Sequence, residues 1–142
     1  PVRGINLSYC PAAYEMMFNE LPDAPFGIEF DSSHCRKQLI DPVQFLRNFP
    51  GRTFNVHIKD HERLPENQQR YGCYDIRSSW DRFPGYGEVD FPAIIHELRE
   101  QNYNGSLTIE AEHDPDFKEE EEIVEALKVS ADKLRGWIEG EK

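Results

Sequence analysis

The hydrophobic positions of the chain follow two spacings, one helical and one of two residues. The helical spacing predicts helices at Pro11–Leu21, after the Asp41-Pro42 pair, after Asp90, and from about Glu119 to Ile138. Between them, short apolar segments bounded by Pro and Gly predict strands at Gly27–Asp31, Thr53–Lys59 and Ser106–Ala111. Because helices alternate with strands and each crossover is helical, the pattern predicts parallel strands in an α/β protein.

One long stretch, Asp60–Val89, shows no clear periodicity. We therefore expect a long loop. Loops of that length inside a compact domain are typically functional, as lids or binding loops. Its aromatic residues Tyr71, Tyr74 and Trp80 could stack on a bound ligand or simply pack the loop.

Each predicted strand has one apolar and one polar face, because successive side chains of a strand point to opposite sides. In the second strand Phe54, Val56 and Ile58 alternate with Asn55, His57 and Lys59. A doubly wound sheet, covered by helices on both faces, has almost continuously apolar strands. An antiparallel sheet with one wet face conflicts with the helical crossovers. The pattern favours a closed β/α barrel with helices outside and a polar interior.

Three polar residues lie at or near the carboxyl ends of the predicted strands, where barrels carry their catalytic residues. They are Asp31, His57 and Glu110. Any one of them alone would more often be structural. Together, two carboxylates and an imidazole form a ligand set that suits Mn²⁺, Mg²⁺, Co²⁺ or Zn²⁺. His34, three residues beyond Asp31, could add a ligand or contact substrate.

Four segments around these residues resemble the sugar phosphate isomerase/epimerase family, which has the xylose isomerase-like TIM barrel of the AP endonuclease family 2 superfamily. They are Phe30–His34 (FDSSH), His57–Asp60 (HIKD), Pro84–Phe91 (PGYGEVDF) and Ile109–His113 (IEAEH). Their order and spacing match the last three strands of that barrel, and Ile5–Leu21 looks like the loop and helix before them. The resemblance implies that residues 1–142 are a single partial domain, the C-terminal portion of a (β/α)₈ barrel without its N-terminal strands.

The resemblance also implies roles for individual residues. Asp31, His57 and Glu110 would bind the divalent metal, and Glu110 would also act as acid or base on the sugar carbon. His34 and Arg63 would bind substrate. The implied function is metal-dependent isomerisation or epimerisation of a small sugar or sugar phosphate through an enediolate. Arg82 looks like a recurring arginine of the family and is a candidate contact at the rim.

The departures from the family leave alternatives open. A full barrel has eight strands and typically ~250 residues, and the family's fourth ligand, a glutamate on the strand before Ile5, is absent. We expect this part alone to be inactive, and a non-catalytic or truncated barrel fragment is one alternative. An endonuclease IV-like metal phosphodiesterase is the least favoured, because those relatives use more histidines than the five present here.

Composition narrows the range of partners. Lys and Arg number 16 against 27 Asp and Glu, so the net charge of −11 argues against nucleic acid and an anionic membrane surface. We expect no signal peptide, and no apolar run approaches the ~20 residues of a membrane span. The three cysteines, Cys10, Cys35 and Cys73, form no CxxC pair and suggest free thiols in a reducing cytoplasm.

His61, His96 and His113 are expected to be surface or packing residues. An exposed polar face with two open strand edges would favour a homo-oligomer.

Overall fold

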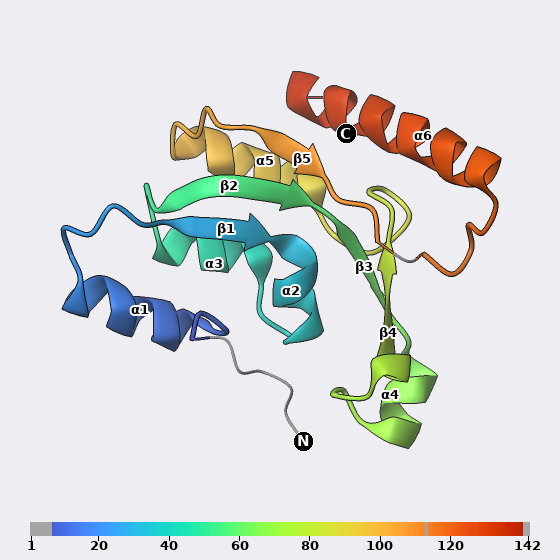
Figure 1. Cartoon of the computed structure of the whole chain (residues 1–142), viewed down its shortest axis with the longest axis horizontal. Coiled ribbons are helices and arrows are strands. Elements are labelled where there is room, and N and C mark those ends of the chain that lie inside the picture. Colours follow the sequence, from blue (N-terminus) through green and yellow to red (C-terminus); the bar gives the residue numbers. More distant parts are fainter. Residues whose placement is uncertain (1–6, 113, 141–142) are drawn as a thin grey trace.

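The computed structural model describes residues 7–112 and 114–140. Its centre is a parallel sheet in the order β1-β2-β5, formed by Ile28–Asp31, Thr53–Ile58 and Leu107–Ile109. Figure 1 shows the three strands running side by side, with α3 and α5 behind them. The predicted parallel α/β arrangement is confirmed, and all three strands end at the same edge of the sheet.

The structure describes six helices, several of which begin at a capping side chain. They are α1 (Pro11–Glu20), α2 (Ser32–Lys37), α3 (Pro42–Asn48), α4 (Pro65–Tyr71), α5 (Phe91–Glu100) and α6 (Glu120–Glu139). The side chains of Asp41 and Asp90 accept backbone N–H groups of the first turns of α3 and α5, as N-cap carboxylates do. A capping box of Glu119 and Glu122 begins α6. The six-residue α2 was not predicted, because one and a half turns are too short to show a period.

The hydrophobic core lies between the sheet and these helices. Ile28, Phe30, Val56 and Ile58 are all nearly inaccessible and pack against side chains of α3 and α5, including Phe45, Leu46, Ile94 and Leu98. The predicted apolar face of the strands is therefore confirmed over most of its length.

Phe54 is the exception on this face. The register of β1 against β2 slips between Ile28 and Glu29, so Phe54 has no partner residue on β1. Its ring lies over Gly27, which has no side chain there, and the side chain stays 59% exposed. The irregularity turns Phe54 out of the core.

The prediction of a long loop at Asp60–Val89 is wrong for most of that stretch. β3 (Asp60–Arg63) pairs antiparallel with β4 (Ser79–Arg82), and α4 with the 3₁₀ turn η1 (Ile76–Ser78) joins the two strands. Figure 1 shows this hairpin extending from the carboxyl end of β2. Each strand has four residues, most of them polar, so no alternating hydrophobic pattern marks it in the sequence.

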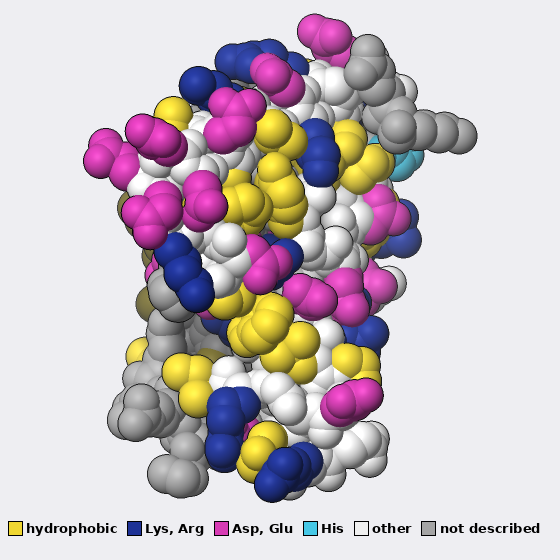
Figure 2. Space-filling model, turned by 90° about the vertical axis from the view of Figure 1, so that its right-hand side faces the viewer, with side chains coloured by type: hydrophobic (Ala, Val, Ile, Leu, Met, Phe, Trp, Pro, Cys, Tyr) yellow, Lys and Arg dark blue, Asp and Glu magenta, His cyan; other side chains and the backbone are white. Residues whose placement is uncertain are grey.

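The surface carries charges of both signs. Figure 2 shows acidic and basic side chains interspersed, with hydrophobic ones between them, on the side where the hairpin and the start of α6 lie. Among the described residues, no helix combines the length and apolar character needed to cross a membrane.

Candidate metal centre

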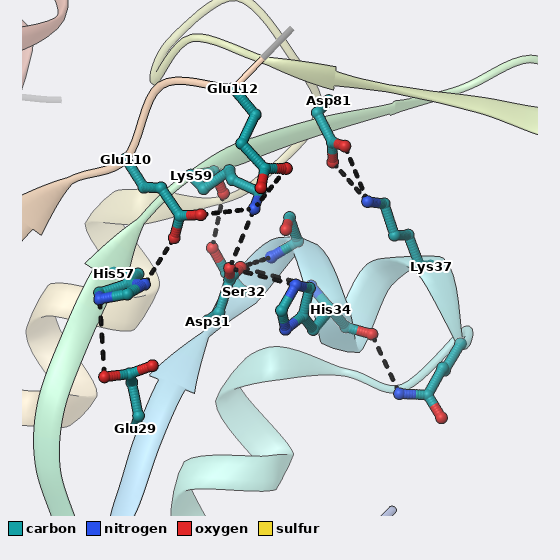
Figure 3. A network of polar contacts seen from close by, with 12 residues as sticks. Glu29, Asp31, Ser32, His34, Lys37, His57, Lys59, Asp81, Glu110 and Glu112 are labelled. Carbon is teal, nitrogen blue, oxygen red and sulfur yellow. Dashed lines mark hydrogen bonds and ion pairs between the residues drawn. The ribbon is translucent and has the colours of Figure 1, made fainter. Parts of the chain in front are cut away.

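The carboxyl ends of the three parallel strands bring the predicted ligand residues together. Asp31 ends β1 and is the register partner of His57 on β2, while Glu110 directly follows β5. One ligand atom from each of the three lies within 4.8 Å of the others. Figure 3 shows them converging on one polar cluster. The predicted convergence is thus confirmed, and metal binding by these residues remains a prediction.

The two oxygens of Asp31 have different surroundings. Oδ1 accepts the backbone N–H groups of Ser33 at 2.7 Å and His34 at 3.4 Å, which caps α2. Oδ2 is buried and has no hydrogen-bond partner among the described residues. Buried polar atoms are rarely left without a partner. Asp31 Oδ2 is therefore an acceptor that a bound cation would satisfy.

His57 is oriented by polar groups on both sides of its ring. Nδ1 lies 2.5 Å from Glu110 Oε2. Nε2 lies 3.3 Å from Asn55 Nδ2 and 3.7 Å from Glu29 Oε2. Metal-binding histidines typically donate the second ring N–H to an acceptor such as a carboxylate, which fixes the tautomer and the ring orientation, and Glu29 is the carboxylate on that side of His57.

Lys59 is the residue of the cluster to which sequence reasoning assigned no role. Its Nζ lies 3.0 Å from Glu110 Oε1, 3.0 Å from Glu112 Oε2 and 3.5 Å from Asp31 Oδ2. Burial alone would lower the pKa of the ammonium, but the bonds to Glu110 and Glu112 and the charge of Asp31 raise the pKa above its ordinary value. The group therefore remains a cation. The two-residue alternation placed Lys59 on the polar face, but only packing shows that the side chain is buried.

The predicted substrate residues lie at different distances from this centre. His34 is exposed on α2, with Nε2 3.6 Å from Asp31 Oδ2, and a pocket of about 60 Å³ opens beside both residues. Arg63, at the end of β3, instead donates to Glu88 Oε2 at 3.1 Å, and Arg36 contacts the same oxygen at 3.4 Å. The structure thus brings His34 to the cluster and holds Arg63 in an ion pair on the hairpin.

Arg82 is a structural ion-pair centre. The side chain is buried and donates to Asp114 Oδ1 at 3.0 Å and Asp116 Oδ2 at 2.7 Å. Burial would lower its pKa, but these carboxylates raise it. The structure places Arg82 in these ion pairs, and the contact at the rim remains a prediction. Arg82 ties β4 to the segment that follows Glu110 and Glu112.

Asp60 organises the loop between β4 and α5. Its two carboxylate oxygens accept backbone N–H groups of His61, Gly85, Gly87 and Val89 at 2.8–2.9 Å. Burial raises the pKa of Asp60, and the four backbone donors act against that shift. One carboxylate at the start of β3 therefore fixes the PGYGEVD segment, including Glu88, the partner of Arg63.

The remaining titratable residues have varied surroundings. His61 is buried, and neither ring nitrogen has a hydrogen-bond partner among the described residues. Burial lowers its pKa to about 4. His96 is exposed, and His113 lies outside the described residues. All three cysteines are free, as expected, and burial raises the pKa of Cys35 to about 12.

Comparison with known proteins gives the family context of this geometry. The family model described as "Xylose isomerase-like TIM barrel" matches residues 2–133. An inosose dehydratase of Clostridium botulinum is 36% identical over 92 residues, which cover 61% of this chain and 30% of that protein. The rhizopine catabolism protein MocC of Rhizobium meliloti is 34% identical over 93 residues, covering 63% of this chain and 29% of that protein. The chain thus spans about 30% of the length of the relatives it matches.

Solved structures show the same fold. A xylose isomerase domain protein from Planctomyces limnophilus superposes with a TM-score of 0.66 at 24% identity, covering 92% of this chain and 43% of that one. The 3-keto-D-glucoside 4-epimerase YcjR of E. coli gives a TM-score of 0.59, also at 24% identity, covering 89% of this chain and 40% of that one. The architecture is therefore a portion of a TIM barrel.

Proposed function

The chain belongs to the xylose isomerase-like TIM barrel family, and from that premise we propose that it is the metal-binding C-terminal part of a sugar-modifying enzyme. The reaction we propose is isomerisation or epimerisation of a small sugar or sugar phosphate, dependent on a divalent metal. The observation that carries the proposal is the convergence of Asp31, His57 and Glu110 within 4.8 Å at one end of the sheet.

The donor set fits a divalent cation. Two carboxylates and one imidazole suit Mn²⁺, Mg²⁺, Co²⁺ or Zn²⁺. Asp31 Oδ2 accepts no hydrogen bond among the described residues and lies 3.5 Å from the Lys59 ammonium, so it is a buried acceptor that a cation would satisfy. Asp31, His57 and Glu110 would hold the ion. When bound, it would supply Lewis-acid stabilisation of negative charge on the oxygens of the substrate.

The side chains around this position supply the other parts of the reaction. Glu110 is half-buried, and its carboxylate acts as the base that removes a proton from the carbon beside the carbonyl. His34 is 64% exposed at the small pocket and offers its ring to a substrate hydroxyl. Arg63 would reach an anionic or polar substrate group only by exchanging its contact with Glu88.

The names of the relatives include both a dehydratase and an epimerase. Isomerisation, epimerisation beside a carbonyl and elimination of water from a ketose all begin with removal of a proton next to the carbonyl. The proposal therefore rests on this shared first step. Elimination of water is the outcome that would reassign the reaction class.

The test combines metal binding with proton exchange. Mn²⁺ binding is measured by electron paramagnetic resonance on the wild type and on His57→Gln and Glu110→Gln, with Glu100→Gln, an exposed position on α5, as control. Exchange at the substrate carbon is followed by NMR in heavy water with a panel of ketoses and inososes, using this chain and the complete reading frame of its gene. We expect the two site variants to lose Mn²⁺ and the complete protein to catalyse exchange. If the complete protein neither binds Mn²⁺ nor catalyses proton exchange, the result would favour a non-catalytic barrel fragment.

A further inference from the structure

Lys59 and the proposed metal share the same carboxylates. We propose that the Lys59 ammonium is a built-in competitor of the metal, which neutralises Asp31 and Glu110 in the metal-free protein and is displaced toward Glu112 when a divalent cation binds. Lys59 would thereby set the metal affinity of the site. This inference rests on the proposed metal site.

The contacts of Nζ carry the first step. The ammonium lies 3.0 Å from Glu110 Oε1 and 3.5 Å from Asp31 Oδ2, so two of the three residues that would bind the metal already hold a cation. Metal–oxygen bonds are about 2.0–2.2 Å long for Mg²⁺ and Zn²⁺. An ion bonded to these same oxygens would therefore lie no more than about 5 Å from the present position of Nζ, and two cations at such a separation in a buried cluster repel each other.

The charge of the cluster explains why a cation is needed there without metal. Asp31, Glu110 and Glu112 bring three carboxylates around one ammonium, whose side chain is only 2% exposed. Removing Lys59 would leave these carboxylates facing each other with no internal cation. The lysine therefore neutralises these carboxylates until the metal replaces it.

Glu112 provides the place to which the ammonium moves. It lies two residues beyond Glu110, is exposed, and already contacts Nζ at 3.0 Å. The backbone of Lys59 is fixed, because its carbonyl oxygen accepts the hydroxyl of Ser32 at 3.0 Å. The flexible four-carbon side chain still lets the ammonium swing. Figure 3 shows Lys59 lying between Glu110 and Glu112, with Asp31 beneath them.

A lysine that only positions the ligands would behave differently. Its removal would spread the carboxylates and weaken metal binding. Removal of a competitor strengthens binding, although it destabilises the metal-free protein. The direction of the change in affinity therefore separates the two roles.

The test is a Mn²⁺ titration of the full chain by calorimetry, comparing the wild type with Lys59→Met and Lys59→Arg. We expect Lys59→Met to bind Mn²⁺ at least about tenfold more tightly, and Lys59→Arg, which keeps the charge, to stay near the wild type. Lys37→Met is the matched control, because Lys37 pairs with Asp81 and not with the ligand residues. Unchanged or weaker binding by Lys59→Met would overturn the inference and leave the metal site standing. If neither the wild type nor Lys59→Met binds Mn²⁺, the metal site and the inference with it would be overturned.

A second measurement uses the wild type alone and does not depend on the folding of a variant. The ammonium ¹⁵N resonance of Lys59 is followed by NMR while diamagnetic Zn²⁺ is added. We expect the resonance to shift as Zn²⁺ saturates the site, because the ammonium leaves Asp31 and Glu110. An unchanged Lys59 resonance at saturation would contradict the displacement.

Discussion

The carboxylate of Asp60 accepts the backbone N–H of Gly87 at 2.9 Å, across 27 residues of sequence. This contact joins the start of β3, directly after His57 and Lys59 in the sequence, to the loop that leads into α5. The same carboxylate also accepts the N–H groups of Gly85 and Val89. A buried side chain directly beyond the candidate metal centre thus determines the path of a distant loop.

Asp60→Asn should destabilise the fold. Each carboxylate oxygen of Asp60 accepts two backbone N–H groups. The side-chain amide of Asn would therefore place its NH₂ group against two N–H donors. We expect a loss of about 2–4 kcal/mol in the free energy of unfolding, measured by urea denaturation. Asp132→Asn, at an exposed ion pair with Arg135, is the control and should change little. Equal losses in the two variants would contradict the role of Asp60.

Gly87→Ala should disturb the same contact from the other side. A Cβ atom at Gly87 would overlap Asp60 Oδ1 and lie 2.7 Å from the carbonyl oxygen of His61. We expect a cost of about 1–3 kcal/mol by urea denaturation. In the Asp60→Asn background the cost should shrink, because the hydrogen bonds that the methyl group displaces are already weakened. Full additivity of the two substitutions would show that they act separately.

Arg82→Gln should strongly destabilise the fold, because Arg82 is a buried ion-pair partner. It would leave Asp114, whose side chain is 1% exposed, without its guanidinium partner. Breaking a buried ion pair by removing one partner typically costs about 3–5 kcal/mol. Arg135→Gln, at an exposed pair, should cost well under that amount. Thermal and urea unfolding of the two variants compare these costs directly, and similar stabilities would argue against a structural role for Arg82.

His61 should make the protein less stable at acidic pH. Burial lowers its pKa from 6.5 to about 4, helped by the charges of Lys37 and Arg36 and opposed by those of Asp81 and Glu88. Between these two values the unfolded chain takes up a proton that the folded chain does not. Stability should therefore fall as the pH falls through this range, by up to about 3 kcal/mol.

The matched variant for this prediction is His61→Phe, which keeps a ring and loses no hydrogen bond, because neither ring nitrogen has one among the described residues. Urea denaturation at pH 7 and pH 4.5 should show a smaller loss of stability for His61→Phe than for the wild type. His96→Phe, at an exposed position on α5, should follow the wild type. An equal pH dependence in all three proteins would show that His61 does not contribute.

The sequence by itself determined the parallel α/β arrangement and the three candidate ligands. The alternation of apolar and polar residues assigned Asp31, His57 and Glu110 to one face, and parallel strands end at a common edge, so local pattern was enough to place them together. The same alternation predicted Phe54 to be buried. The register slip that exposes it depends on pairing with β1, which no pattern within a single strand encodes.

The tertiary structure alone decided which polar residues are buried and what they contact. The hairpin of β3 and β4 forms from two short polar segments that are paired across 16–22 residues, so it has no hydrophobic period to reveal it. Lys59, Asp60 and Arg82 are charged residues of a kind usually found on the surface. Their burial is compensated by partners that lie 25–53 residues away along the chain, and such compensation exists only after the chain has folded.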